Sequence, residues 1–232
     1  MNLTEFDPTN SKYEEAESVD EAEALVSTYP NSAKAWVIYM IYHLKLADVN
    51  KARYVVRRGI QTINYREDEE KLNLWKALMN LEAFHGNNKS LFTVFEEALK
   101  FTDKKKTYLH MLNLLCTTEK AEEIEEFCQR IFKHFKADTD VYLTLLTYYM
   151  KVGKTKEARN LYSRSLKCIP AKEYPNIMGR FAQLEYKHGD IEKSLSLYEE
   201  ILVKYPKRKD LKSVYINILK ANGQEERANA LL

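Results

Sequence analysis

The sequence predicts an all-α protein, a right-handed superhelical solenoid of about six helical hairpins. Three observations predict it. The 232 residues include only 6 Gly and 5 Pro, which leaves few positions for tight β-turns or phosphate-binding loops. Leu, Ala, Glu and Lys, which favour helices, dominate the composition. One pattern of aromatic, small and turn residues then recurs along the chain, as expected for stacked repeats.

Two tryptophan-centred segments define the repeat. A position in the first helix of each hairpin, the helix-A marker, falls at Trp36, Trp75, Tyr108, Tyr142, Met178 and Lys212, with spacings of 39, 33, 34, 36 and 34 residues. Sixteen residues later comes a position in the second helix, the helix-B marker, at Ala52, Leu91, Ile124, Ala158, Ser194 and Ala228. Because the offset is constant while the spacing varies, insertions fall between hairpins and not inside them.

The elements follow from this register in order. Residues 1–10 are expected to form a flexible N-terminus, and residues 11–232 a single repeat domain. A cap helix covers about 11–29, and hairpins follow at about 32–64, 70–102, 104–136, 138–169, 173–205 and 208–232. Eleven residues after the helix-A markers stand Ala47, Gly86, Glu119, Gly153, Gly189 and Gly223. Glycine there predicts a left-handed residue that ends helix A, and Pro30, Pro170, Pro175 and Pro206 are expected to stop helix B.

Aromatic side chains at recurring register positions are expected to fill the core between stacked hairpins. The apolar residues of the second helices follow helical spacing, with a small residue at several helix-B markers and an aromatic ring four residues later. The core aromatics that we predict are Trp36, Tyr39, Trp75, Phe95, Tyr108, Tyr142, Tyr162, Phe181, Tyr198 and Tyr215.

The sequence shows no pattern that indicates an enzyme, a cofactor site or a metal site. The five histidines are scattered over separate hairpins, and no glycine-rich phosphate loop or nucleophile motif occurs. Cys116, Cys128 and Cys168 have no paired spacing, so we expect them to be ordinary packing residues in a reducing compartment. The start of the chain lacks a secretory pattern and no segment is apolar enough to span a membrane, so the chain is expected in the cytosol or nucleus.

Charge is distributed unevenly along the chain. Residues 1–30 carry 8 acidic residues against one lysine, a net charge of −7, whereas residues 130–212 carry 18 Lys and Arg against 10 Asp and Glu, a net charge of +8. Basic clusters near turns and hairpin junctions are candidates for one edge that follows a phosphate backbone; the alternative is that they complement helix dipoles and keep the surface soluble. The candidates are Lys104, Lys105, Lys106, Lys151, Lys154, Lys156, Arg159, Lys204, Lys207, Arg208 and Lys209.

Several of these strings resemble HAT repeats (half-a-TPR), the hairpins of RNA-processing proteins. They include the W-x-x-Y pattern at Trp36 and Tyr39 and the helix-B string EARNLYSRSL. REDEEKLNLWKALMNLE at 66–82, KEYPNIMGRFAQLEYKHGD at 172–190 and YPKRKDLKSVYI at 205–216 are similar to stretches of one family. That family is the ribosomal RNA-processing factor with an array of S1 domains followed by C-terminal HAT repeats, and the resemblance covers about residues 20–220.

The resemblance implies a non-catalytic scaffold in ribosome biogenesis, located in the nucleus and nucleolus. It implies pre-ribosomal proteins of the small-subunit processome as partners and pre-rRNA as a secondary contact. No S1 domain lies within the 232 residues, so the resemblance also implies an S1-bearing RNA-binding region, either fused or separate.

Two functions of other classes remain open at this point. One is a dimerising HAT scaffold in mRNA 3′-end processing or splicing, which pairs through the C-terminal edge of the array. The other is a TPR-like co-chaperone that holds acidic peptide tails. That function needs Asn, Lys and Arg side chains converging on one groove, and such residues do not recur at fixed repeat positions.

Overall fold

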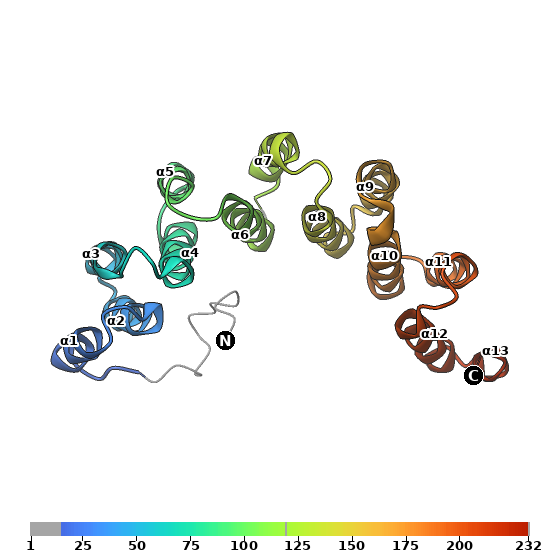
Figure 1. Ribbon diagram of the computed structural model, residues 1–232, viewed down its shortest axis with the longest axis horizontal. Coiled ribbons are helices and arrows are strands. Elements are labelled where there is room, and N and C mark those ends of the chain that lie inside the picture. Colours follow the sequence, from blue (N-terminus) through green and yellow to red (C-terminus); the bar gives the residue numbers. More distant parts are fainter. Residues whose placement is uncertain (1–14, 119, 232) are drawn as a thin grey trace. The chain divides into compact units, whose positions relative to one another are not determined.

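The computed structural model describes residues 15–118 and 120–231, which form thirteen α-helices, one short 3-10 helix and no strand (Figure 1). This confirms the predicted all-α array of helical hairpins. The helices are α1 (Val19–Thr28), α2 (Ala33–Lys45), α3 (Val49–Thr62), α4 (Asp68–His85), α5 (Asn88–Ala98), α6 (Lys104–Thr117), α7 (Ala121–His134), α8 (Thr139–Lys151), α9 (Thr155–Cys168), α10 (Tyr174–His188), α11 (Ile191–Lys204), α12 (Lys209–Ala221) and α13 (Glu225–Asn229), with the 3-10 helix η1 (Ala171–Glu173) before α10.

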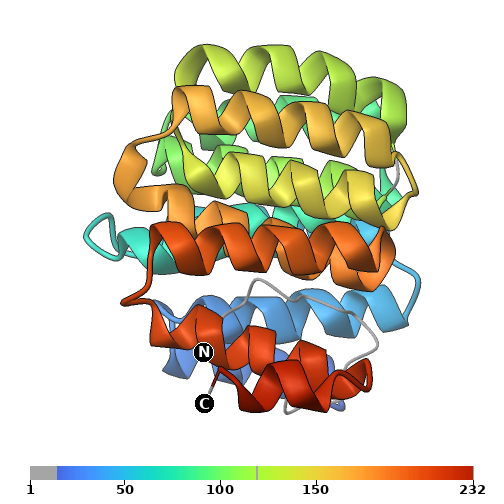
Figure 2. The same cartoon turned by 90° about the vertical axis from the view of Figure 1, so that its right-hand side faces the viewer.

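Contacts divide the chain into two compact units, an N-terminal unit that ends at Ile124 and a C-terminal unit that begins at Glu125, within α7. In the N-terminal unit the first helices α2, α4 and α6 form a row, and α3 and α5 lie along one side of it (Figure 1). In the C-terminal unit α8 packs on α9 and α10, and α10 on α11. Within each unit, neighbouring helices have roughly parallel axes (Figure 2).

Each predicted hairpin range contains two of the observed helices, although α4 begins two residues before its range. The cap helix is α1, which starts later than expected, and residues 1–14 of the predicted N-terminus and cap lie outside the described residues. Pro175 does not follow helix B as predicted but lies in the first turn of α10. Proline is tolerated there because a backbone N–H in the first turn has no hydrogen-bond partner within the helix. The single domain and the right-handed superhelix stay predictions.

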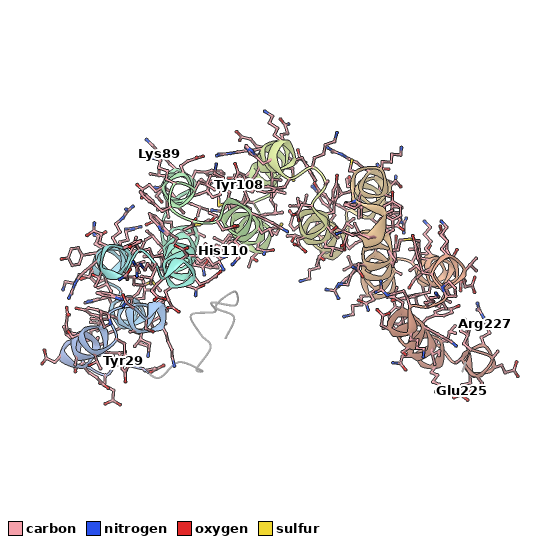
Figure 3. The ribbon with its side chains drawn as sticks, in the orientation of Figure 1. Tyr29, Lys89, Tyr108, His110, Glu225 and Arg227 are labelled. Atoms are coloured by element: carbon pink, nitrogen blue, oxygen red, sulfur yellow. The ribbon has the colours of Figure 1, made fainter. Side chains whose placement is uncertain are left out.

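The predicted core aromatics lie mostly inside the stack. Nine of the ten are at most 5% exposed, and the tenth, Tyr162, is half-buried and stacks on Phe181 with ring centroids 4.2 Å apart. On α6, Tyr108 meets Phe95 edge to face at 5.1 Å, and the neighbouring His110 is buried against Asn80. Lys89 of α5, by contrast, projects outward (Figure 3).

The turn glycines fall into two classes, and only one of them matches the prediction. Gly153 and Gly223 have φ values of +77° and +72°, as predicted, and Ala47 takes the same left-handed conformation with φ +57°. For Gly86 and Gly189 the prediction is wrong, because their φ values are −110° and −130°. Glu119 lies outside the described residues.

A different constraint favours glycine at positions 86 and 189. At each of them a Cβ atom would overlap the carboxylate of a buried glutamate four residues earlier, Glu82 or Glu185. The second class of turn therefore keeps glycine for space and not for its backbone conformation. These two glutamates also hold the stack together at two junctions between hairpins.

Candidate interaction surface

Two ion pairs, each between a buried glutamate and a partly exposed arginine, join consecutive hairpins at the same repeat register. Glu82 stands seven residues after its helix-A marker, is 4% exposed and accepts hydrogen bonds from Arg53 Nε at 2.6 Å and Nη2 at 3.2 Å. Glu185 occupies the same register, is 1% exposed and accepts from Arg159 Nε at 2.8 Å and Nη2 at 3.0 Å. Each arginine directly follows a helix-B marker. Arg159, a predicted surface cation, therefore already has a carboxylate partner from the next hairpin.

Lys106, Lys204 and Arg208, also predicted surface cations, are likewise engaged within the chain. Lys106 pairs with Glu69, and Lys204 Nζ lies 2.5 Å from Glu200 Oε1. Arg208 donates from Nε and Nη2 to the two carboxylate oxygens of Asp210 at 2.8 and 2.7 Å, and this hydrogen bonding lowers the pKa of Asp210 to about 2. Intramolecular pairing weakens the attraction of these cations for an anionic partner.

The other predicted cations do not lie along one edge. Lys105 is half-buried. The turn between α8 and α9 holds Lys151, Lys154 and Lys156, and the junction between α11 and α12 holds Lys207 and Lys209. Turns inside hairpins and junctions between them fall at opposite ends of the helices, so these clusters lie at opposite edges of the C-terminal unit. Lys104 belongs to the N-terminal unit.

A set of cations, of which the sequence analysis predicted only Lys151, lies on the first helices of the C-terminal unit. We call Lys151, Arg180, Lys187 and Lys220 the A-helix cations; they are exposed on α8, α10 and α12. Within the described residues none of them makes an ion pair, and Arg180 donates only to Gln183, at 3.1 Å. Reading along the exposed face of each first helix could have found Lys187, which stands nine residues after its helix-A marker, as the predicted Lys151 does.

Acidic side chains are scarce around the A-helix cations. The helices α8, α10 and α12 contain one acidic residue each. Asp140 and Asp210 lie in the first turns of their helices, away from the C-terminal turns that carry most of the lysines, and Glu185 is buried on Arg159. This face therefore presents a net positive charge, which attracts anionic partners.

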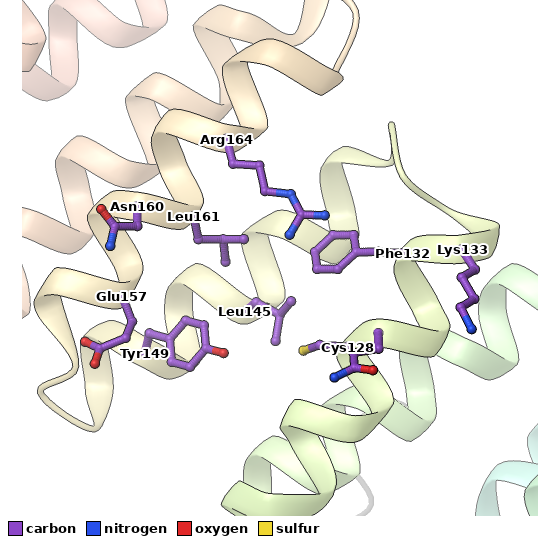
Figure 4. Close-up of a pocket in the computed structure, with 10 residues that line it drawn as sticks. Cys128, Phe132, Lys133, Leu145, Tyr149, Glu157, Asn160, Leu161 and Arg164 are labelled. Atoms are coloured by element: carbon purple, nitrogen blue, oxygen red, sulfur yellow. The ribbon is translucent and has the colours of Figure 1, made fainter.

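A second candidate surface is an open groove in the C-terminal unit, the α7–α9 groove, with a volume of about 580 Å³ (Figure 4). The guanidinium of Arg164 lies over the Phe132 ring, 4.7 Å from its centroid. Burial raises the pKa of the Cys128 thiol to about 12, so this cysteine is a poor nucleophile. The groove is lined by Cys128, Gln129, Phe132, Lys133, Leu145, Tyr149, Glu157, Asn160, Leu161 and Arg164.

Two further observations concern the described residues. No three His, Cys, Asp or Glu side chains in this part of the chain gather in a way that could hold a metal ion. Among the same residues, no helix has the length and apolar character needed to cross a membrane.

Comparison with known proteins gives consistent relatives. The chain is 36% identical over 210 residues to Protein RRP5 homolog of Homo sapiens, a match that covers 90% of this chain and 11% of the relative. It is 40% identical over 189 residues to rRNA biogenesis protein rrp5 of Schizosaccharomyces pombe, covering 82% and 11%. It is 38% identical over 203 residues to rRNA biogenesis protein RRP5 of Arabidopsis thaliana, covering 87% and 10%.

No protein-family model matches the chain. Among solved structures, it is similar to the crystal structure of YrrB, a TPR protein with an unusual peptide-binding site, at 12% identity and a TM-score of 0.40, over 86% of this chain and 98% of that one. The sequence matches confirm the family resemblance drawn from the repeat strings. The chain is therefore related to the RRP5 rRNA biogenesis proteins through one region that makes up 10–11% of the length of the relatives described above.

Proposed function

We propose that this chain is a non-catalytic scaffold in ribosome biogenesis that binds pre-ribosomal proteins during pre-rRNA processing and small-subunit processome assembly, in the nucleolus. The observation that carries the proposal is the match of 82–90% of the chain to proteins named for rRNA biogenesis. Stacked hairpins suit such a role, because each repeat adds surface next to its neighbour and the array presents an extended face to partners.

Contact with pre-rRNA is the secondary part of the proposal. The A-helix cations have no acidic partner among the described residues, so their charge is available to phosphate groups. Binding of lysine and arginine to phosphates releases counterions, and the affinity then falls steeply with salt. This part of the proposal places RNA on the first helices of the C-terminal unit and not on the turn clusters alone.

The test is sedimentation of a tagged chain with pre-ribosomal particles in extracts of its own cells. We expect the chain to sediment with these particles, and reversal of the charge at three A-helix cations to weaken its binding to purified pre-rRNA. The reversed lysines are Lys151, Lys187 and Lys220, and the matched control reverses Lys34, Lys89 and Lys100 in the N-terminal unit.

The two parts fail separately. If the unaltered chain does not sediment with pre-ribosomal particles, the scaffold role is wrong. If it does, but both triple variants bind pre-rRNA as tightly as the parent, the RNA contact is wrong and the scaffold role stands. The helical content of each variant, measured by circular dichroism, excludes unfolding as the cause.

A further inference from the structure

An ion pair joins α3 and α5, two consecutive second helices in the N-terminal unit. Its partners are Arg57 of α3 and Glu97 of α5, with Arg57 Nη1 3.0 Å from Glu97 Oε2. Arg57 stands five residues after the helix-B marker of α3, and Glu97 six residues after that of α5. The equivalent positions at the α7–α9 groove are Gln129 and Arg164. There the acidic partner is missing and an arginine stands in its place.

The cations of the α7–α9 groove consequently have no carboxylate partner within the described residues. Arg164 rests on the face of Phe132, a cation–π contact that leaves its N–H donors available. Lys133 stands exposed on the facing helix. The acidic residue of the lining, Glu157, lies two helical turns before Arg164 on α9, near Tyr149 (Figure 4). The groove therefore has a positive end.

The groove floor is apolar. Leu145 is 1% exposed, and Phe132 and Leu161 are half-buried on either side of it. A polyphosphate chain would leave these side chains without apolar contacts, whereas an aliphatic side chain would cover them and gain free energy from the removal of apolar surface from water. Charge and surface together favour a protein segment with both a carboxylate and an aliphatic residue.

We propose that the α7–α9 groove binds an acidic, leucine-bearing segment of a partner protein. Its carboxylate pairs with Arg164 and Lys133, as Glu97 pairs with Arg57 in the N-terminal unit, and its aliphatic side chain packs between Phe132 and Leu161. The inference rests on the proposed protein-binding role and adds the surface and the chemistry of the partner.

The test uses the full chain with methyl-labelled leucines and three probes. They are a synthetic peptide of leucine and glutamate in helical spacing, the same peptide with glutamine in place of glutamate, and oligouridine. We expect the glutamate peptide to shift the methyl resonances of Leu145 and Leu161 in a saturable way, and the glutamine peptide to bind about tenfold more weakly or less. Arg164→Glu should weaken the binding of the glutamate peptide by about tenfold or more.

Lys156→Glu is the matched control, since it reverses an exposed cation on the same helix that does not line the groove. Lys133→Glu is the second test variant. The proposal is overturned if neither peptide shifts the resonances of the two leucines, or if both peptides bind with equal affinity. It is overturned as well if Arg164→Glu and Lys133→Glu bind the glutamate peptide as tightly as Lys156→Glu does. It is also overturned if oligouridine alone shifts these resonances. Because purified chain is used, none of these outcomes depends on its association with pre-ribosomal particles.

Discussion

The ion pair between Arg53 and the buried Glu82 allows the packing between hairpins to be tested by a double-mutant cycle. The Glu82 carboxylate accepts from Arg53 and, at 2.6 Å, from Ser90 Oγ, while its side chain is 4% exposed. Arg53→Met keeps most of the apolar stem and removes the guanidinium, so a buried charge loses its counterion. Arg53→Met combined with Glu82→Met removes both charges and leaves an apolar contact of similar volume.

The expected energies differ in a characteristic way. Loss of one partner from a fully buried ion pair costs about 3–5 kcal/mol. The side chain of Arg53 is 31% exposed, so water reaches the pair and we expect Arg53→Met to cost about 2–4 kcal/mol. The double variant should cost about 1 kcal/mol or less, because replacement of both charges leaves no unpaired group in the core. The double substitution is thus expected to lower the free energy of unfolding less than the single substitution.

Urea unfolding followed by tryptophan fluorescence is the assay. The chain has two tryptophans, Trp36 and Trp75, and both lie in the N-terminal unit, so the signal reports on the unit that holds the pair. Arg57→Met is the control, because its pair with Glu97 is 47% and 34% exposed at the two side chains and should cost within about 0.5 kcal/mol. Additive single and double effects, or an equal cost for Arg57→Met, would refute the reasoning.

The same pair predicts a dependence on pH. Burial alone would raise the pKa of Glu82, but hydrogen bonds from Arg53 and Ser90 outweigh it and hold the pKa below its usual 4.5. A lowered carboxyl pKa contributes stability that is present above pH 4.5 and is lost as the pH falls through the folded-state value. The difference in unfolding free energy between the parent and Arg53→Met should therefore shrink below pH 4.5.

Three further predictions concern turns and a buried histidine, each checked by urea unfolding followed by circular dichroism, which reports on the helices of both units. Ala47→Gly should stabilise the chain by about 0.5–1 kcal/mol, since relief of the left-handed strain exceeds the added chain entropy; a loss of stability would contradict the φ of this turn. Gly189→Ala should destabilise by about 1–3 kcal/mol, because the new methyl group overlaps the Glu185 carboxylate; an unchanged midpoint would contradict the overlap. Burial and then the charge of Lys76 lower the pKa of His110 to about 4. Stability from neutral His110 should thus be complete above pH 6.5 and fall by roughly 3 kcal/mol as the pH drops to 4, a loss that His110→Gln should reduce.

The repeat architecture could be predicted from the sequence because it rests on local spacing. A constant offset of sixteen residues between the two markers fixes the hairpin, whatever the residue at each marker. The two classes of turn glycine could not be separated by the same argument, since both end a first helix. A local signal does exist: Glu82 and Glu185 stand four residues before Gly86 and Gly189, whereas Tyr149 precedes Gly153 at that distance.

The candidate surface was less predictable, because the partner of a charge often comes from another hairpin. Lys106 pairs with Glu69 and Arg159 with Glu185, which are 37 and 26 residues away in sequence. Runs of neighbouring lysines attract notice in a sequence, but an exposed helix face collects residues that are three to five positions apart. The A-helix cations are instead isolated residues spread over three separate helices, and Gln129 and Arg164 match the positions of Arg57 and Glu97 only when the repeats are aligned.

Affinity purification of the chain from its own cells, with mass spectrometry of the proteins and sequencing of the RNA, tests the central claim most directly. The account predicts enrichment of small-subunit processome proteins together with pre-rRNA. Enrichment of polyadenylation or splicing factors in their place would contradict the role in ribosome biogenesis and leave the helical-hairpin fold intact.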